Sequence, residues 1–219
     1  MARRDNEVVR VVLERYGRSY AAQAGIRLAD RPAPLYQLLV LATLLSARIS
    51  SDIAVRAASE LFKAGYRTPR AMRAARWQGR VDALGRGHYR RYDERTASLL
   101  GDAAELLIQR WRGDLRRLRD QAGGKPAPIA SLLAEFPGIG SAGAGIFLRE
   151  AQAVWPSVSP YLDKRVLDSV GKAGLPVRPA SLAALTSSSQ ELARLAAALI
   201  RVSRDKQAAA EIAKAASER

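Results

Sequence analysis

The stretch 136–145 reads FPGIGSAGAG and constrains the fold more than any other part of the chain. Gly138 and Gly140 have no Cβ atom, so the backbone there can take positive φ values and approach another backbone closely. Apolar runs precede and follow the stretch, and the small residues at 141–145 let the second run pack tightly. The pattern predicts two helices joined by a tight turn, a helix-hairpin-helix over about 129–150.

The predicted turn opens onto the first residues of a helix. The N–H groups of a first helical turn have no intrahelical partners, and together with the helix dipole they suit a phosphate. We therefore predict contacts to the DNA backbone from a short run of hairpin residues: Gly138, Ile139, Gly140, Ser141 and Ala142. An ordinary turn between two helices is the alternative, because glycine beside proline is a common helix break.

The charge of the chain favours a polyanionic partner. It has 36 Lys and Arg against 21 Asp and Glu, a formal net charge of +15. Nucleic acid and an anionic membrane surface both fit this excess, as does a basic protein with neither partner. No run of 18 apolar residues exists to span a membrane, and the first residues adjoin no apolar signal segment. We expect a cytoplasmic, nucleoid-associated monomer without membrane contact.

Cysteine is absent and His88 is the single histidine. The composition excludes disulfides, thiolate zinc sites and a cysteine-held iron–sulfur cluster, and it argues against a Ser-His-Asp triad. Any chemistry must use carboxylates, lysines, hydroxyls or the backbone, and we expect no cofactor.

The remaining periodicity is helical, so the sequence predicts an all-α fold. The run 35–46 is apolar nearly all round and should form a buried central helix. A residue among Ser50, Ser51 and Asp52 is expected to cap the next helix, and Thr68 to cap another. Asp93 is expected to cap a long helix. The tryptophans are predicted to lie in the core: Trp77, Trp111 and Trp155.

Three motifs carry a family resemblance. LLSAR at 44–48 follows the apolar run, FPGIG at 136–140 forms the turn, and YLDKRVL at 161–167 follows the hairpin. In this order and at these separations they resemble the helix-hairpin-helix DNA glycosylases related to endonuclease III. The resemblance covers about residues 35–170.

The resemblance implies two helical lobes with a cleft between them. A six-helix barrel lobe would span residues 30–150, and residues 1–29 with 151–219 would form the other. It further implies double-stranded DNA as the partner and excision of a damaged or mispaired base as the activity.

Asp163 matches the catalytic carboxylate of that family. A carboxylate can stabilise the oxocarbenium-like transition state of N-glycosidic cleavage or activate water. An N-cap is the alternative role, and both roles can coexist. Ala142 stands where bifunctional members carry the lyase lysine, so we expect water as the nucleophile. Lys164 is expected to face phosphate or solvent.

Arg48 matches the intercalating glutamine of the family. Its guanidinium can stack in the space left by an extruded base, contact a phosphate, or simply be solvated. The basic segment 86–95 interleaves arginines with tyrosines, which suits base stacking, although a solvated charged face is an equal alternative. Its candidate pocket or DNA contacts are His88, Tyr89, Arg91 and Tyr92.

The resemblance also implies a sodium or potassium ion at the hairpin, held by the backbone carbonyls of Phe136 and Ile139. The leading hypothesis is thus a monofunctional DNA glycosylase of base-excision repair. The alternatives are a catalytically inactive helix-hairpin-helix DNA-binding protein and a basic all-α scaffold without a DNA role.

Overall fold

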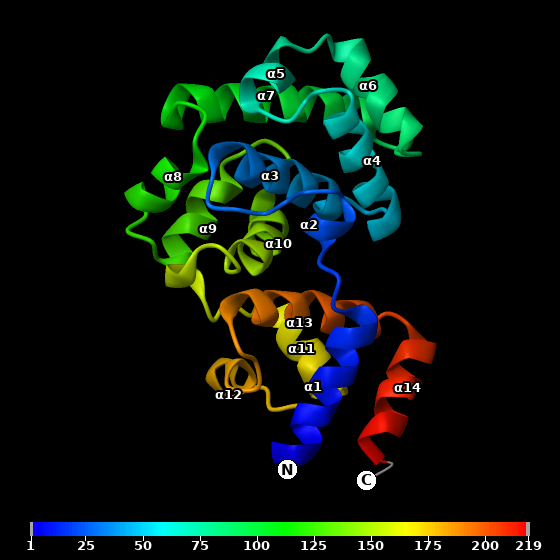
Figure 1. The fold of residues 1–219 in the computed structure, drawn as a ribbon. Coiled ribbons are helices and arrows are strands. Elements are labelled where there is room, and N and C mark those ends of the chain that lie inside the picture. The colour runs from blue at the N-terminus through cyan, green and yellow to red at the C-terminus, as the bar shows by residue number, and fades with distance from the viewer. Residues whose placement is uncertain (1, 218–219) are drawn as a thin grey trace. The chain divides into compact units, whose positions relative to one another are not determined.

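The structure, a computed structural model, describes residues 2–217, and the regular elements in that range are all helices (Figure 1). The all-α prediction is confirmed. The chain divides into two compact units: one contains residues 21–148, and the other contains the described residues before and after that range. Within 2–217, no helix has both the length and the apolar character needed to cross a membrane.

The unit of residues 21–148 is built around α3, which begins at Pro32 and is buried along most of its length. α3 packs against α4 and α8, and α7 packs against α5 and α6. The helices of this unit are α2 (Tyr20–Gln23), α3 (Pro32–Ser46), α4 (Ser51–Lys63), α5 (Pro69–Ala74), α6 (Trp77–Arg86), α7 (Asp93–Trp111), α8 (Leu115–Gln121), α9 (Pro126–Ala134) and α10 (Gly140–Ala151), whose last residues belong to the other unit.

A buried arginine ties three helices of this unit together. Arg80 of α6 donates from Nε to the carbonyl of Ala97 in α7, and from Nη1 to the carbonyls of Met72 and Ala75 at the end of α5. Carbonyls in a last helical turn lack intrahelical partners, and a cation is favourable there. Gly101 leaves the space for this side chain, because a Cβ there would lie 2.9 Å from Arg80 Nη2.

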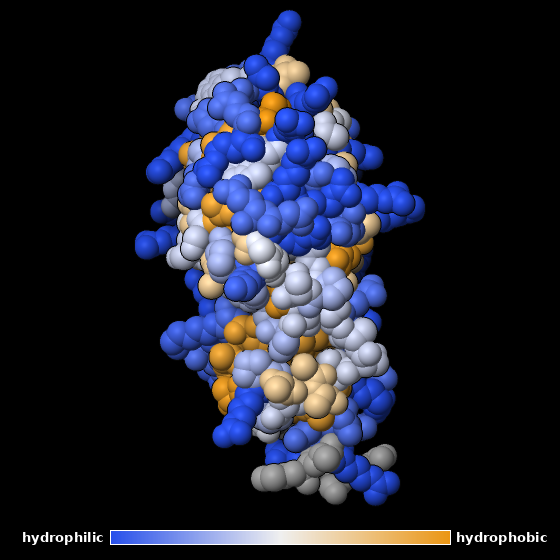
Figure 2. All heavy atoms as spheres, turned by 90° about the vertical axis from the view of Figure 1, so that its left-hand side faces the viewer, coloured by the Kyte–Doolittle hydropathy of each residue, from blue (hydrophilic) through white to orange (hydrophobic). Residues whose placement is uncertain are grey.

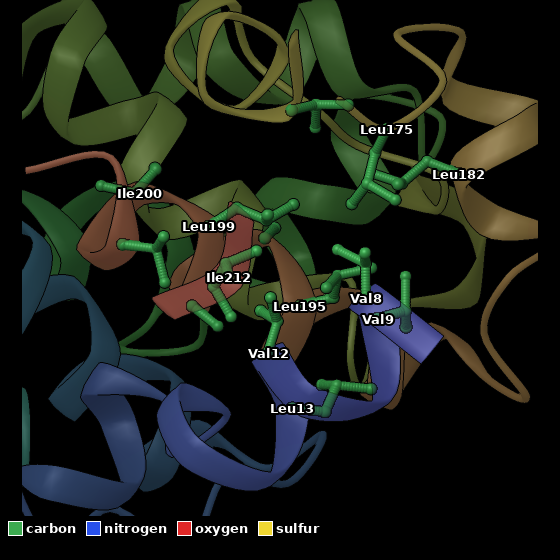
Figure 3. Close-up of a cluster of buried hydrophobic side chains, with 14 of the residues drawn as sticks. Val8, Val9, Val12, Leu13, Leu175, Leu182, Leu195, Leu199, Ile200 and Ile212 are labelled. Carbon is green, nitrogen blue, oxygen red and sulfur yellow. The ribbon is translucent and has the colours of Figure 1, made fainter. Parts of the chain in front are cut away.

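The other unit packs α1, α11 and α14 around α13 and its neighbours. Valines and leucines on one side of α1 meet the apolar face of α13, with Leu175, Leu182 and Ile212 completing the cluster (Figure 3). Because α1 and α13 are far apart in sequence, this core depends on long-range packing. The elements of this unit are α1 (Ala2–Tyr16), the short 3-10 helix η1 (Pro156–Val158), α11 (Lys164–Lys172), α12 (Pro179–Ala183), α13 (Ser189–Val202) and α14 (Lys206–Ser217).

Several local predictions can be compared with the structure. Ser50 and Thr68 cap α4 and α5, each accepting a hydrogen bond from the N–H three residues on. Asp93 is the first residue of α7 rather than its cap, which is Tyr92 without a side-chain bond. The core assignment is right for Trp111 and Trp155 but wrong for Trp77, which is 42% exposed. Trp77 lies on the surface, where its indole N–H is satisfied by Ser98 on the adjoining α7.

Candidate functional site

The helix-hairpin-helix is present as predicted, with α9 ending at Ala134 and α10 beginning at Gly140. Gly138 and Gly140 have φ values of +83° and +55°, in the region that side chains rarely adopt. The N–H of Ile139 donates to the carbonyl of Phe136 at 3.1 Å, which closes the turn. Both glycines thus have the positive φ values that their positions in the sequence predicted.

An aromatic stack fixes the entry to the turn. The centres of the Phe136 and Trp111 rings lie 5.4 Å apart at an interplanar angle of 21°. The guanidinium carbon of Arg110 lies 4.4 Å from the centre of the Trp111 ring. The Trp111 indole N–H donates to Gln121 at 2.7 Å. Two helices, α7 and α8, therefore hold the ring against which the first residue of the turn packs.

The two hairpin glycines have different surroundings. A Cβ on Gly138 would lie 3.2 Å from both Leu99 Cδ1 and Thr43 Cγ2, so the turn packs closely against α3 and α7. A Cβ on Gly140 would meet nothing within 4 Å. Ser46 Oγ lies 3.2 Å from the carbonyl oxygen of Gly138 and 2.7 Å from that of Thr43. With one hydroxyl hydrogen, Ser46 donates to one of them at a time.

The close approach at the small residues after the turn is to α3. A Cβ on Gly143 would lie 3.5 Å from Ser46 Cβ and 3.1 Å from Ile139 Cγ2. Ser141 and Ala142, like Gly140, are exposed at the start of α10, whereas Ile139 is 2% exposed. The side chain of Ile139 is therefore a core residue, and only its backbone is available to a ligand.

A pocket of about 270 Å³ lies beside the turn, within the unit of residues 21–148. Its volume is just below the range for small-molecule sites, about 300–1,000 Å³. Three segments distant in sequence meet there: the end of α3 with the following loop, the start of α7, and the hairpin. The lining residues are Thr43, Ser46, Ala47, Arg48, Tyr89, Tyr92, Arg95, Thr96, Leu99 and Gly138.

The pocket brings four predicted site residues together: Arg48, Tyr89, Tyr92 and Gly138. Arg48 is exposed and Tyr92 is half-buried, so both can meet a ligand. Tyr89 is only 2% exposed, and its hydroxyl pairs with Thr96 at 3.2 Å. Burial raises the pKa of Tyr89. Tyr89 is thus a wall of the pocket held by its neighbour.

His88 and Arg91 lie outside that lining. His88 is exposed in a left-handed backbone conformation with φ +64°. The Arg91 guanidinium lies 5.2 Å from the centre of the Tyr92 ring, a cation–π distance. Sequence reasoning missed the other lining residues, which are Thr43, Ser46, Ala47, Arg95, Thr96 and Leu99. Arg95 was within the basic segment already singled out.

Asp163 belongs to the other unit, where it caps α11. Its Oδ1 accepts from the N–H of Val166 at 3.0 Å, and its Oδ2 accepts from Nη2 of Arg149 at 2.6 Å. The Arg149 side chain is 4% exposed and that of Asp163 is 20% exposed. The N-cap role foreseen for Asp163 is therefore real, and a buried ion pair is added to it.

Gln152 fixes the segment that carries Asp163. Its side-chain amide donates to the carbonyl of Tyr161 at 3.0 Å and accepts from the N–H of the same residue at 2.9 Å. Burial, and secondarily the charge of Asp163, raises the pKa of Tyr161. Sequence reasoning missed Arg149 and Gln152, although polar residues in an otherwise apolar run after the hairpin were a usable signal.

Lys164, the first residue of α11, has a side chain that is 87% exposed. Its Nζ lies 2.9 Å from the carboxylate of Asp168 one turn later. An exposed pair at this spacing is worth a few tenths of a kcal/mol, so the ammonium can readily leave it for a phosphate.

The hairpin carbonyls fit a monovalent cation in their chemistry. Oxygen atoms suit hard cations, and a carbonyl has two lone pairs. The oxygens of Phe136 and Ile139 each accept one backbone N–H, from Ile139 and Gly143, which leaves a lone pair on each. No group of three or more His, Asp or Glu side chains within the described residues could hold a metal ion.

Comparisons with known proteins give a match in structure. No model of a protein family matches the chain. No curated protein matches it significantly. A solved structure of a non-covalent endonuclease III–DNA complex is similar, with a TM-score of 0.54 and 15% sequence identity, over 92% of this chain and 85% of that one. A trapped endonuclease III–DNA covalent intermediate, an estranged-adenine complex, has a TM-score of 0.49 and 18% identity over the same shares of each chain.

The first of these likenesses defines the fold. The chain has the all-α helix-hairpin-helix glycosylase fold of endonuclease III. The fold class expected from the three motifs is therefore confirmed.

Proposed function

We propose that the chain is a DNA glycosylase of base-excision repair, which binds double-stranded DNA and hydrolyses the N-glycosidic bond of an extruded base. The observation that carries the proposal is the pocket beside the hairpin. There Arg48, Tyr92 and Gly138, each singled out by sequence for a different contact with DNA, meet around one cavity on an endonuclease III fold.

The hairpin would hold the DNA backbone. Gly140, Ser141 and Ala142 are exposed at the N-terminus of α10, where unpaired N–H groups and the helix dipole favour a phosphate. The unit of residues 21–148 carries 20 Lys and Arg against 11 Asp and Glu, which attracts a polyanion. Hydrophilic side chains predominate over the face of this unit drawn in Figure 2.

Asp163 would supply the catalytic carboxylate. Hydrolysis joins the oxygen of water to the sugar carbon and breaks the carbon–nitrogen bond, whose electron pair leaves with the base. One proton of the water passes to the departing base and the other remains on the new hydroxyl. The carboxylate stabilises the positive charge that develops on the sugar.

We propose that the enzyme is monofunctional. A lyase needs an amine of depressed pKa, and Ala142 stands at the family's lysine position. The unit of residues 21–148 has two lysines, Lys63 and Lys125, and neither lines the pocket. Lys164 is solvated and paired with Asp168, which does not activate an amine. The carbonyls of Phe136 and Ile139 would hold a sodium or potassium ion beside the bound phosphate.

One observation favours the alternative of an inactive DNA-binding protein. Both oxygens of Asp163 already accept hydrogen bonds, and the charge of Arg149 offsets that of the carboxylate. A neutralised carboxylate stabilises a developing cation less than a lone one. The two functions differ in base release and agree in DNA binding.

The test is a panel of duplexes, each bearing one damaged or mispaired base, incubated with the protein and analysed after hot alkali. We expect strand cleavage at one class of lesion only after alkali, since hydrolysis leaves an intact backbone. Borohydride should trap no covalent adduct. Release of no base from any duplex, with binding retained, would support the inactive alternative. A borohydride adduct would overturn the monofunctional proposal.

A further inference from the structure

We propose that Arg149 is a positioning residue for Asp163, an inference that rests on the proposed glycosylase function. Arg149 Nη2 lies 2.6 Å from Oδ2, and the N–H of Val166 lies 3.0 Å from Oδ1. Two donors on different elements, one on each oxygen, define the orientation of the carboxylate. With either one removed, only one hydrogen bond is left to orient the side chain.

The same end of α10 also holds the backbone before Asp163. Gln152 makes two hydrogen bonds to the backbone of Tyr161, and its amide also donates to the carbonyl of Arg149 at 2.9 Å. Gln152 is fully buried. Arg149 and Gln152 therefore form one clamp, whose two parts orient the side chain and the main chain of the same short segment.

Stability alone does not explain Arg149. Its Nε is buried and has no hydrogen-bond partner among the described residues, which is unfavourable. Buried ion pairs are also weak sources of stability, because well-packed apolar residues often serve as well or better. Arg80 differs, since it is buried but donates to three carbonyls from α5 and α7 and so links helices.

Arg149 has two opposing effects on catalysis. Its charge offsets that of Asp163, which weakens stabilisation of the developing cation, while its hydrogen bond fixes the direction of the carboxylate. Misplacement of a reacting group by about 1 Å can cost about 100-fold in rate. The inference is that orientation outweighs the offset charge, so removal of Arg149 slows base release.

The experiment measures single-turnover base release and binding to the same lesion duplex. Three variants are compared with the natural protein: Arg149→Met, Arg149→Lys and Arg149→Ala. Arg80→Met is the matched control, because it also removes a buried arginine but touches no carboxylate. Circular dichroism melts set a working temperature at which every variant is folded.

We expect Arg149→Met to bind the duplex as the natural protein does and to release base about 10- to 100-fold more slowly. Arg149→Lys should be intermediate, because an ammonium keeps the charge but loses the planar fork. Millimolar guanidinium chloride should partly restore Arg149→Ala, whereas equal sodium chloride should not. Arg80→Met should melt at a lower temperature and release base at the natural rate.

An unchanged or faster rate in folded Arg149→Met, or equal losses of binding and rate, would overturn the positioning role. Rescue by sodium chloride as well as by guanidinium would do the same. If the natural protein releases no base from any duplex, the glycosylase proposal itself fails. The measurement on the natural protein is enough to show this.

Discussion

The turn of the hairpin and the Asp163 corner, which consists of Asp163 with Arg149 and Gln152, hold their functional groups in opposite ways. The turn uses glycine backbone, and the first residues of α10 are exposed to solvent. Asp163 is held by a buried arginine 14 residues away, with both carboxylate oxygens engaged. The first arrangement suits a ligand bound through many similar phosphates. The second suits one group that must keep a single direction.

The largest expected effect of a substitution is at Asp163. Asp163→Asn keeps an oxygen for the N–H of Val166 but removes the charge, so base release should fall by about 10²–10⁴-fold while binding to the lesion duplex persists. The variant should also melt earlier, because Arg149 is left buried without a counter-charge.

Asp168→Asn is the matched control for that variant. It removes an exposed carboxylate from the same helix and should leave stability within about 0.5 kcal/mol and base release unchanged. Equal rates for Asp163→Asn and the natural protein would assign Asp163 to capping alone.

The next largest effect concerns salt. If the hairpin binds phosphates, the affinity of the protein for undamaged duplex should fall steeply between 50 and 200 mM salt. The fall should be about 10³-fold for six or more phosphates. Fluorescence anisotropy of a labelled duplex gives the slope, and Asp163→Asn should have the same slope as the natural protein. Affinity independent of salt would contradict phosphate binding and favour a basic scaffold.

The sequence was more informative about the turn than about the corner, and the reason is physical. A turn needs φ > 0 at particular positions, so Gly138 and Gly140 marked it locally. The buried partner of Asp163 lies 14 residues away: a polar residue in the apolar run after the hairpin marked Arg149 as unusual, but nothing in the sequence paired it with Asp163. Trp77 shows the same limit, because a tryptophan is compatible with both core and surface, and its bond to Ser98 depends on how α6 packs against α7.

The pocket could be anticipated in its members but not in its shape. Arg48 was marked by its place in the LLSAR motif, Tyr92 by aromaticity in a basic segment and Gly138 by turn chemistry, yet their meeting depends on how α3, α7 and the hairpin pack. His88 and Arg91 had the same composition signals and lie outside the lining. Composition identifies residue types that can bind, and packing decides which of them share a cavity.

A smaller effect separates the two glycines of the turn. Gly140→Val should cost about 1–2 kcal/mol for its left-handed backbone and no more, because no atom lies within 4 Å of an added Cβ. It should weaken DNA binding, because it distorts the turn that presents the start of α10. Gly138→Val should cost more stability, since its Cβ would crowd Leu99 and Thr43. Urea unfolding ranks the two variants. Natural DNA affinity in folded Gly140→Val would make the hairpin a structural turn only.

The smallest expected effect lies in the pocket wall. Tyr89→Phe removes the hydroxyl bonded to Thr96 and should cost about 1 kcal/mol without changing DNA affinity. Because burial raises the pKa of Tyr89, the folded state holds its phenolic proton more tightly than the unfolded state does. The stability from this difference is full below the unfolded pKa of about 10 and is lost as pH rises further. Urea titrations at several alkaline pH values should therefore show a shallower loss of stability with pH in Tyr89→Phe than in the natural protein.

Tyr92→Leu is the contrasting variant. The half-buried Tyr92 ring is available for base stacking, so this variant should weaken binding to the lesion duplex. Weakened DNA binding in Tyr89→Phe and none in Tyr92→Leu would reverse the roles assigned to the two tyrosines.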